Sequence, residues 1–144
     1  MIVPRVAYRA LWALHRGLRR LSGGRIGTRA PRGDSAGTLF LHTVGHKSGQ
    51  PRANGLYYLE EGGNLVVVAS NAGADRDPSW WLNLGAHPDA EVEIGGRRRP
   101  VRARAATTDE SARLIPRLDR ANADFVTYRA KVTRRIPIMI LEPR

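Results

Sequence analysis

The first hydrophobic pattern along the chain is helical. Between residues 3 and 21, apolar side chains recur every three or four positions and share one face of a helical wheel, while five arginines share the opposite face. This spacing predicts a strongly amphipathic helix, in which Trp12 falls among the arginines. Two interpretations stay open: the helix docks on the body of the protein, or it makes a reversible peripheral contact with an anionic membrane surface.

A stretch rich in Gly, Ser, Arg and Pro follows over residues 22–37 and is typical of a linker. The pattern therefore divides the chain into residues 1–36, with the N-terminal amphipathic helix and linker, and residues 37–144, with the principal domain. A total of 144 residues suits one such domain with one core.

From residue 38 the apolar positions take the two-residue period and β-branched composition of strands. Residues 60–64 and 95–97 lie between such runs and are predicted to form hairpin turns. Six strands are expected, over residues 38–44, 54–60, 64–70, 90–95, 100–106 and 135–142. The predicted fold class is α+β: a small closed or split β-barrel of about six mostly antiparallel strands with flanking helices.

Two short helices are predicted among these strands. The first should begin with Asp77 as its N-cap and end near Gly85. The second should begin with a capping box formed by Thr107 and Glu110, and Pro116 should kink it. The side chains of this second helix that are expected to face the sheet are Ala112, Ile115, Leu118 and Ala121.

Composition excludes several kinds of chemistry. The chain has no cysteine, which rules out disulfides, thiolate metal sites and a cysteine nucleophile. The four histidines are scattered without the spacing of a metal site, so no metal is expected. No apolar run is long enough to span a bilayer, and no signal-peptide pattern is present. A cytoplasmic protein is therefore expected, and peripheral membrane association through residues 3–21 stays open.

The net charge of +11 is unevenly distributed. Residues 1–52 hold ten Lys or Arg side chains against the single acid Asp34, whereas the remainder is close to balance. This concentration favours an anionic ligand or membrane surface near the N-terminal third over a generally basic surface. A barrel that binds nucleic acid is kept as an alternative, which would require binding that falls steeply with salt, but no nucleic-acid partner is expected.

Residues 43–52, TVGHKSGQPR, combine two glycines, a hydroxyl and two cations in one turn after an apolar strand. Gly45 and Gly49 would let the backbone take positive φ and approach a ligand closely. The donors to phosphate or carboxylate oxygens would be exposed backbone amides together with Lys47, Ser48 and Arg52. The composition of this turn therefore predicts a binding site for an anionic tail of a ligand. A basic hairpin turn that binds no ligand would have the same composition.

A second candidate site lies where a valine-rich strand runs into the small residues 69–74. Small side chains would leave room for a flat ligand, and Ser70 with the following amides could bond a ring carbonyl or a phosphate. Two adjacent tryptophans follow on the first predicted helix, and we expect Trp81 in the core and Trp80 against the ligand. Simple core packing of this segment is the alternative.

Taken together, these motifs resemble the deazaflavin-dependent nitroreductase family of actinobacteria, part of the split β-barrel flavin and deazaflavin oxidoreductases. The resemblance runs from about residue 37 to 143. It rests on five motifs in order: Thr43-x-Gly45-x-Lys47-Ser48-Gly49-Gln50-Pro51-Arg52, then Asn54 with Leu56-Tyr57, then Ser70 to Gly73, then Pro78-x-Trp80-Trp81-x-Asn83-Leu84, and Arg135-Ile136-Pro137.

The resemblance implies that residues 37–144 bind coenzyme F-420, an 8-hydroxy-5-deazaflavin with a phosphate and polyglutamate tail. The residues implied to hold the tail are Lys47, Ser48 and Arg52, and those implied to line the groove are Asn54 and Tyr57. The ring would be met by Ser70, Asn71, Ala72 and Gly73 and flanked by Trp80 and Tyr128. Tyr128 is the candidate catalytic residue, as a proton donor beside bulk water.

The activity implied is hydride transfer from the reduced deazaflavin to a small or lipophilic acceptor, such as a quinone, an enone or a nitro compound. Three positions depart from the family pattern: His46 and Asn71 stand where cations are common, and Phe125 stands in a segment rich in tyrosine among members active on nitro compounds. Cofactor binding is therefore favoured over nitroreduction. The alternatives are an FMN-binding oxidoreductase on the same barrel and a non-catalytic deazaflavin-binding or membrane-associated relative, and the oligomeric state stays open.

Overall fold

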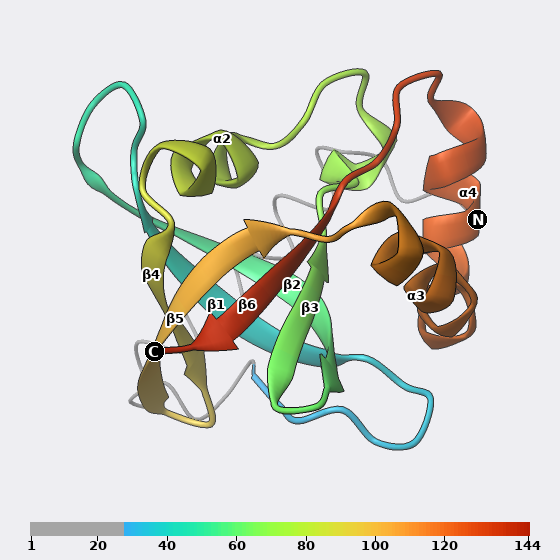
Figure 1. Ribbon diagram of the computed structural model, residues 1–144, viewed down its shortest axis with the longest axis horizontal. Helices are drawn as coiled ribbons and strands as arrows, with labels where there is room; N and C mark the ends of the chain where they lie inside the picture. Colours follow the sequence, from blue (N-terminus) through green and yellow to red (C-terminus); the bar gives the residue numbers. More distant parts are fainter. Residues whose placement is uncertain (1–27) are drawn as a thin grey trace.

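The computed structural model describes residues 28–144, so the predicted helix at residues 3–21 and the first part of the predicted linker lie outside the described residues. The strands are β1 (Gly37–Val44), β2 (Pro51–Glu61), β3 (Asn64–Val68), β4 (Asp89–Ile94), β5 (Arg97–Ala105) and β6 (Ile138–Pro143). They form a closed barrel in the order β1-β2-β3-β6-β5-β4, and every neighbouring pair is antiparallel (Figure 1). The predicted α+β barrel and its antiparallel strands are confirmed.

Strand bounds differ from the expected ones for local reasons. β2 begins at Pro51 rather than at residue 54 because its ladder with β1 continues to the pair Val44 and Pro51. β3 ends at Val68 rather than at residue 70, because the backbone becomes left-handed at Asn71. β6 begins at Ile138 rather than at residue 135.

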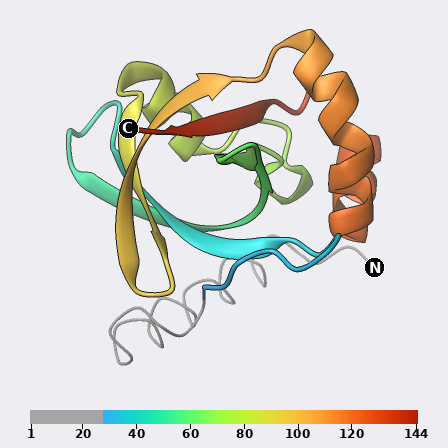
Figure 2. The same ribbon diagram turned by 60° about the horizontal axis from the view of Figure 1, so that its bottom comes forward.

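Apolar side chains fill the barrel and also cover part of its outside. Leu39 and Leu41 of β1 lie in the inner cluster, as the two-residue period of a strand requires. A second cluster lies between the strands β2, β3 and β6 and two helices, α3 (Thr108–Ala121) and α4 (Ala123–Lys131). Figure 2 shows these two helices on one flank of the barrel. Within residues 28–144, no helix combines the length and the apolar character needed to cross a membrane.

The first predicted helix is present as α2 (Ser79–Ala86), but its N-cap prediction was wrong. Pro78 occupies the N-cap position, and no side chain caps the helix there. The carboxylate of Asp77 instead accepts a 2.6 Å hydrogen bond from Arg134. The Asp77 carboxylate thus bonds a distant residue and does not cap the helix.

The capping box of α3 is confirmed, because Thr107 accepts from the Glu110 amide and the Glu110 carboxylate accepts from the Thr107 amide. The predicted inner face was partly wrong: Ala112 is exposed, and the buried side chains are Ser111, Leu114 and Leu118. A strict spacing of three residues drifts around a helix of 3.6 residues per turn, so the predicted set left the buried face.

The sequence pattern did not indicate α4. Its N-cap is Asn122, whose side chain accepts a hydrogen bond from the Asp124 amide at 3.0 Å. Arg129 joins α4 to α3 by a two-pronged ion pair with Asp119, at 2.6 and 3.0 Å, and its guanidinium lies 5.2 Å from the ring centre of Phe125. These contacts hold the two helices as one layer beside the barrel.

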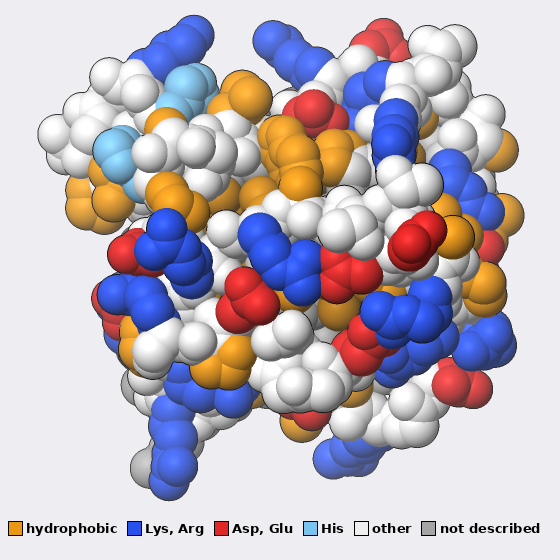
Figure 3. All heavy atoms as spheres, in the orientation of Figure 1, with side chains coloured by type: hydrophobic (Ala, Val, Ile, Leu, Met, Phe, Trp, Pro, Cys, Tyr) orange, Lys and Arg blue, Asp and Glu red, His pale blue; other side chains and the backbone are white. Residues whose placement is uncertain are grey.

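Basic and acidic side chains alternate across the face shown in Figure 3. On β4 and β5, Arg98 pairs with Glu91 at 3.3 Å and Arg102 pairs with Asp89 at 3.4 Å. Such cross-strand pairs break up a single field of positive charge. The net positive charge of the chain therefore does not form one continuous basic patch on this face.

Candidate functional site

The basic turn between β1 and β2 is a compact hydrogen-bonded loop. The Gly45 amide donates to the Gln50 carbonyl and the Gly49 amide to the Gly45 carbonyl, both at 2.9 Å. Gly49 has a φ of 68°, as predicted, but Gly45 is not among the glycines with positive φ. Gly45 serves a different purpose: a Cβ at this position would lie 2.5 Å from Oγ of Ser48, so only glycine leaves room for that hydroxyl.

The predicted tail-binding residues converge on one pocket, which we call the tail pocket. Its lining residues are Gly45, His46, Lys47, Ser48, Arg52, Ala53, Asn54, Ser79 and Asn83. Ser48 Oγ accepts hydrogen bonds from the Gln50 amide at 3.1 Å and from Arg52 Nη2 at 3.2 Å. The hydroxyl thereby orients the Arg52 guanidinium, and Lys47 lies in the same exposed turn, so two cations are available to one anion. The prediction that backbone amides of the turn would serve as further donors was largely wrong, because the amides of Gly45, His46, Gly49 and Gln50 all donate to acceptors within the protein.

Asn83 of α2 fixes this turn on the barrel, a role that the sequence did not indicate. The buried Asn83 accepts from the His46 amide at 2.9 Å, lies 2.7 Å from His46 Nδ1, and donates to the buried Thr43 hydroxyl at 3.1 Å. Because Oδ1 of Asn83 is the acceptor, the proton of a neutral His46 belongs on Nδ1, and Nε2 is the nitrogen left for other partners. His46 is therefore oriented by the fold.

The predicted small-residue segment forms a strained turn, η1 (Asn71–Gly73), after β3. Asn71, Ala72 and Gly73 have φ values of 48°, 53° and 79°. Left-handed non-glycine residues cost of order 1 kcal/mol each and persist only where their surroundings hold them. A Cβ on Gly73 would lie 3.3 Å from both Tyr128 and Lys131, so the glycine also permits close packing of α4 on this turn.

Arg134, between α4 and β6, holds this turn in place. Its guanidinium donates to the carbonyls of Ala69 at 3.3 Å, Ser70 at 3.0 Å and Ala74 at 3.1 Å, besides the Asp77 carboxylate. Only 16% of the Arg134 side chain is exposed. The sequence did not indicate this residue, because no local signal distinguishes it from the neighbouring arginine.

The tryptophan assignment was wrong. Trp80 is 3% exposed and lies in the inner cluster of the barrel, whereas Trp81 is only partly buried and packs against that cluster. Neighbouring residues on a helix point about 100° apart, so the docking of α2 over the barrel selects one of the two for the core. Trp80 does not line the tail pocket, nor does it line a second pocket that lies between β2, β3 and the helices α3 and α4.

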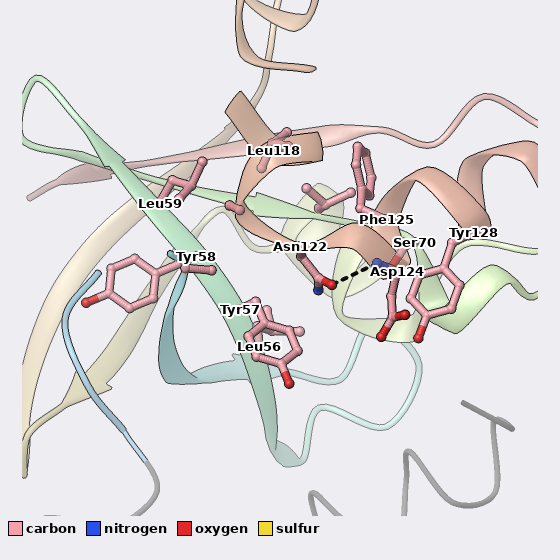
Figure 4. A pocket seen from close by; sticks show the side chains of 13 residues that line it. Leu56, Tyr57, Tyr58, Leu59, Ser70, Leu118, Asn122, Asp124, Phe125 and Tyr128 are labelled. Carbon is pink, nitrogen blue, oxygen red and sulfur yellow. Dashed lines mark hydrogen bonds between the residues drawn. The ribbon is translucent and has the colours of Figure 1, made fainter. Parts of the chain in front are cut away.

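A second pocket, which we call the helix pocket, lies between β2, β3 and the helices α3 and α4. It brings together three predicted site residues, Tyr57, Ser70 and Tyr128. Figure 4 shows Tyr57, Asp124 and Tyr128 directing their oxygen atoms to the same side of this pocket. Burial raises the pKa of the Tyr128 hydroxyl, and the nearby Asp124 charge and Tyr57 raise it further.

Both pockets take residues from β2, which carries Arg52 and Asn54 at the tail pocket and Tyr57 at the helix pocket. From Arg52 to Tyr57 the strand rises by roughly 17 Å, at about 3.3 Å per residue. The two pockets share this strand but no lining residue, so each is a separate candidate for one part of a ligand.

Comparison with known proteins places this arrangement in one family. The sequence profile of the F-420H(2)-dependent quinone reductase family matches residues 12–143. The chain belongs to this family. Membership in the F-420H(2)-dependent quinone reductases confirms the class of oxidoreductase and the coenzyme that the motifs predicted.

Individual relatives support this membership. A putative F-420H(2)-dependent quinone reductase of Mycobacterium tuberculosis is 44% identical over 107 residues, which cover 74% of this chain and 90% of that protein. Another F-420H(2)-dependent quinone reductase of the same species is 36% identical over 137 residues, which cover 93% of this chain and 91% of that protein. The structure of an F-420H(2)-dependent reductase, FDR-A, superposes with a TM-score of 0.66 at 32% identity and covers 73% of this chain and 93% of that one.

Proposed function

We propose that this protein transfers a hydride from reduced coenzyme F-420 to a quinone. The observation that carries the proposal is the convergence of Lys47, Ser48 and Arg52 on one pocket at the start of β2, the strand that leads to the helix pocket. The family profile supports both the coenzyme and the class of acceptor.

The residues present fit this coenzyme. Lys47 and Arg52 are suited to phosphate and carboxylate groups, because charged donors make the stronger hydrogen bonds to such anions. For the ring, the helix pocket offers Tyr57, Ser70 and Tyr128. Ala72 and Gly73 are buried and line neither pocket, so their part is to shape the turn that carries Ser70.

The proposed reaction requires little acid or base catalysis from the protein. When bound, the reduced deazaflavin supplies the hydride from its central ring carbon. The tail pocket anchors the anionic end, and the turn held by Arg134 positions Ser70 toward the helix pocket. Alignment of donor and acceptor accounts for much of the rate in such a reaction. Tyr128, whose raised pKa keeps its hydroxyl protonated at neutral pH, holds a proton at the side of the pocket where the acceptor oxygen would lie.

Tyr128→Phe is expected to lower kcat with a quinone about tenfold, a modest loss because water can replace the hydroxyl as donor. Asp124→Asn removes one cause of the raised pKa of Tyr128, so the alkaline fall in kcat should begin at lower pH than in the parent protein. The measurement is kcat against pH, with Asp109→Asn on the first turn of α3 as a control. If Tyr128→Phe has the parent's kcat and pH profile, the proton comes from another group.

The proposed function is tested by mixing purified protein with reduced coenzyme F-420 and menadione and following oxidation of the coenzyme by its absorbance. Menadione-dependent oxidation well above the protein-free rate is expected. Parallel titrations with oxidised coenzyme F-420 and with FMN distinguish the alternatives. Tight binding of FMN and none of deazaflavin would replace this proposal by a flavin oxidoreductase, and binding of deazaflavin without turnover of any quinone would indicate a non-catalytic carrier.

A further inference from the structure

Asn83 of α2 is a buried polar side chain at the tail pocket. It is 3% exposed, and its carboxamide bonds the His46 amide at 2.9 Å, His46 Nδ1 at 2.7 Å and the Thr43 hydroxyl at 3.1 Å. A backbone amide can only donate, so the Asn83 atom that it meets must be the oxygen Oδ1. Because Nδ1 of His46 lies against the same oxygen, Nδ1 carries a proton whether the ring is neutral or charged.

The second ring nitrogen of His46 is the one left for a ligand. His46 is half-buried and lines the tail pocket together with Lys47 and Arg52. Among residues 28–144, the hydrogen bonds of His46 involve its amide and Nδ1, and Nε2 makes none. With Nδ1 protonated, Nε2 is a bare acceptor in the neutral ring and an N–H donor in the charged ring. Protonation would therefore change Nε2 from an atom that repels an anionic oxygen to one that bonds it.

No carboxylate lines the tail pocket in the described part of the chain. Other charged or titratable side chains lie on the elements around the turn: His42 and Glu93, which pair at 3.0 Å, then Glu60 and Glu61 at the far end of β2, and Asp75, Arg76, Asp77 and His87 on either side of α2. None of these lines the pocket. The negative charge opposite a protonated His46 would therefore come from the ligand, so anion binding and protonation of His46 are linked.

We propose that His46 is a third cation of the tail pocket, present only when its ring is protonated, and that Asn83 is the positioning residue that keeps Nε2 available to the coenzyme tail. The inference rests on the proposed function, because the anion is taken to be the phosphate or a carboxylate of coenzyme F-420. A charged His46 would donate to an anionic oxygen that Lys47 and Arg52 also bind, whereas a neutral ring would offer that oxygen only a lone pair. Affinity for the coenzyme therefore falls as pH rises, and binding near neutral pH takes up a proton.

The first measurement needs no ligand. Nitrogen NMR of the imidazole rings in the free full chain, at about pH 8, reports which ring nitrogen carries the proton. His46 is expected in the Nδ1–H form, and the exposed His87 in the same spectrum is the internal reference. Asn83→Ala should release His46 from that form and leave the signals of His87 unchanged. If His46 of the parent protein carries its proton on Nε2, the inference is overturned.

The second measurement is calorimetric titration of the full chain with oxidised coenzyme F-420 from about pH 5.5 to about pH 8.5. The Kd of His46→Gln is divided by the parent's Kd at the same pH, so that titration of the coenzyme and of the other residues cancels. This ratio is expected to rise from about one at the alkaline end to about ten at the acid end, the gain from one charged donor in an exposed pocket. Titrations in two buffers of different ionisation enthalpy count protons, and near neutral pH the parent should take up more than His46→Gln.

Asn83→Asp separates positioning from packing. A carboxylate has nearly the same shape and still accepts from His46, but its charge favours the charged ring, so the fall in affinity should move to higher pH by about one pH unit. A merely structural role would change Kd equally at every pH. The matched control is His87→Gln, which removes an exposed histidine outside the pocket and should keep the parent's curve.

The outcomes separate this inference from the proposed function. Coenzyme binding with a Kd ratio that is the same at every pH would overturn the role of His46 and leave the proposed function intact. No binding of the coenzyme at any pH would overturn both. The comparison of the parent with His46→Gln decides between these outcomes even if the variants at the buried Asn83 do not fold.

Discussion

Replacing Lys47 and Arg52 together by alanine is expected to raise the Kd for coenzyme F-420 about 100-fold. Both side chains line the tail pocket, and the Arg52 guanidinium is oriented by its bond to Ser48. A hydrogen bond to a charged group contributes roughly 1.5–3 kcal/mol. Because both residues are exposed, solvent screening reduces each contribution to about tenfold in Kd, or about 1.4 kcal/mol.

The measurement is quenching of the fluorescence of the oxidised coenzyme at two salt concentrations. The parent protein should lose affinity as salt rises, and the double variant should lose much of that salt dependence along with its affinity. Arg97→Ala is the matched control, because it removes the same charge at the turn between β4 and β5, at the other end of the barrel (Figure 1). Equal weakening by the control would mean that the net charge of the protein, and not the tail pocket, attracts the coenzyme.

The parts of the site that sequence reasoning predicted are those built by neighbouring residues. Ser48 and Arg52 are four positions apart and meet within one turn, and the left-handed φ of Gly49 follows from the same short loop. Thr107 and Glu110 close a capping box within three residues. In such cases the interacting groups are held together by covalent geometry, so their residue types and spacing are enough to predict the contact.

The parts that were missed depend on contacts between distant segments. Arg134 bonds groups 57 to 65 positions earlier in the chain, and Asn83 bonds residues 37 to 40 positions earlier. The choice of Trp80 rather than Trp81 for the core depends on how α2 docks, which no local pattern specifies. The barrel architecture could therefore be predicted from the sequence. The long-range hydrogen bonds that hold the site residues in place could be identified only in the tertiary structure.

Arg134→Leu is expected to lower the free energy of unfolding by about 3 kcal/mol. This value is at the low end of the range for removing one partner of a buried ion pair, because the Asp77 side chain is 33% exposed. The variant leaves the Asp77 carboxylate and the carbonyls of Ala69, Ser70 and Ala74 without the guanidinium. The measurement is urea denaturation followed by circular dichroism. Arg135→Leu is the matched control, since this neighbouring arginine is exposed. Equal losses in the two variants would contradict the role assigned to Arg134.

Arg134→Lys separates charge from geometry. Lysine keeps the charge beside Asp77, but its compact ammonium cannot match a planar guanidinium that bonds one carboxylate and three carbonyls at once. We therefore expect Arg134→Lys to recover part of the stability while the Kd for coenzyme F-420 stays about tenfold higher than in the parent. Added guanidinium at millimolar concentration should restore affinity in Arg134→Ala more than in Arg135→Ala. If affinity simply follows stability across these variants, Arg134 supports the fold without shaping the turn at Asn71–Gly73 for the ring.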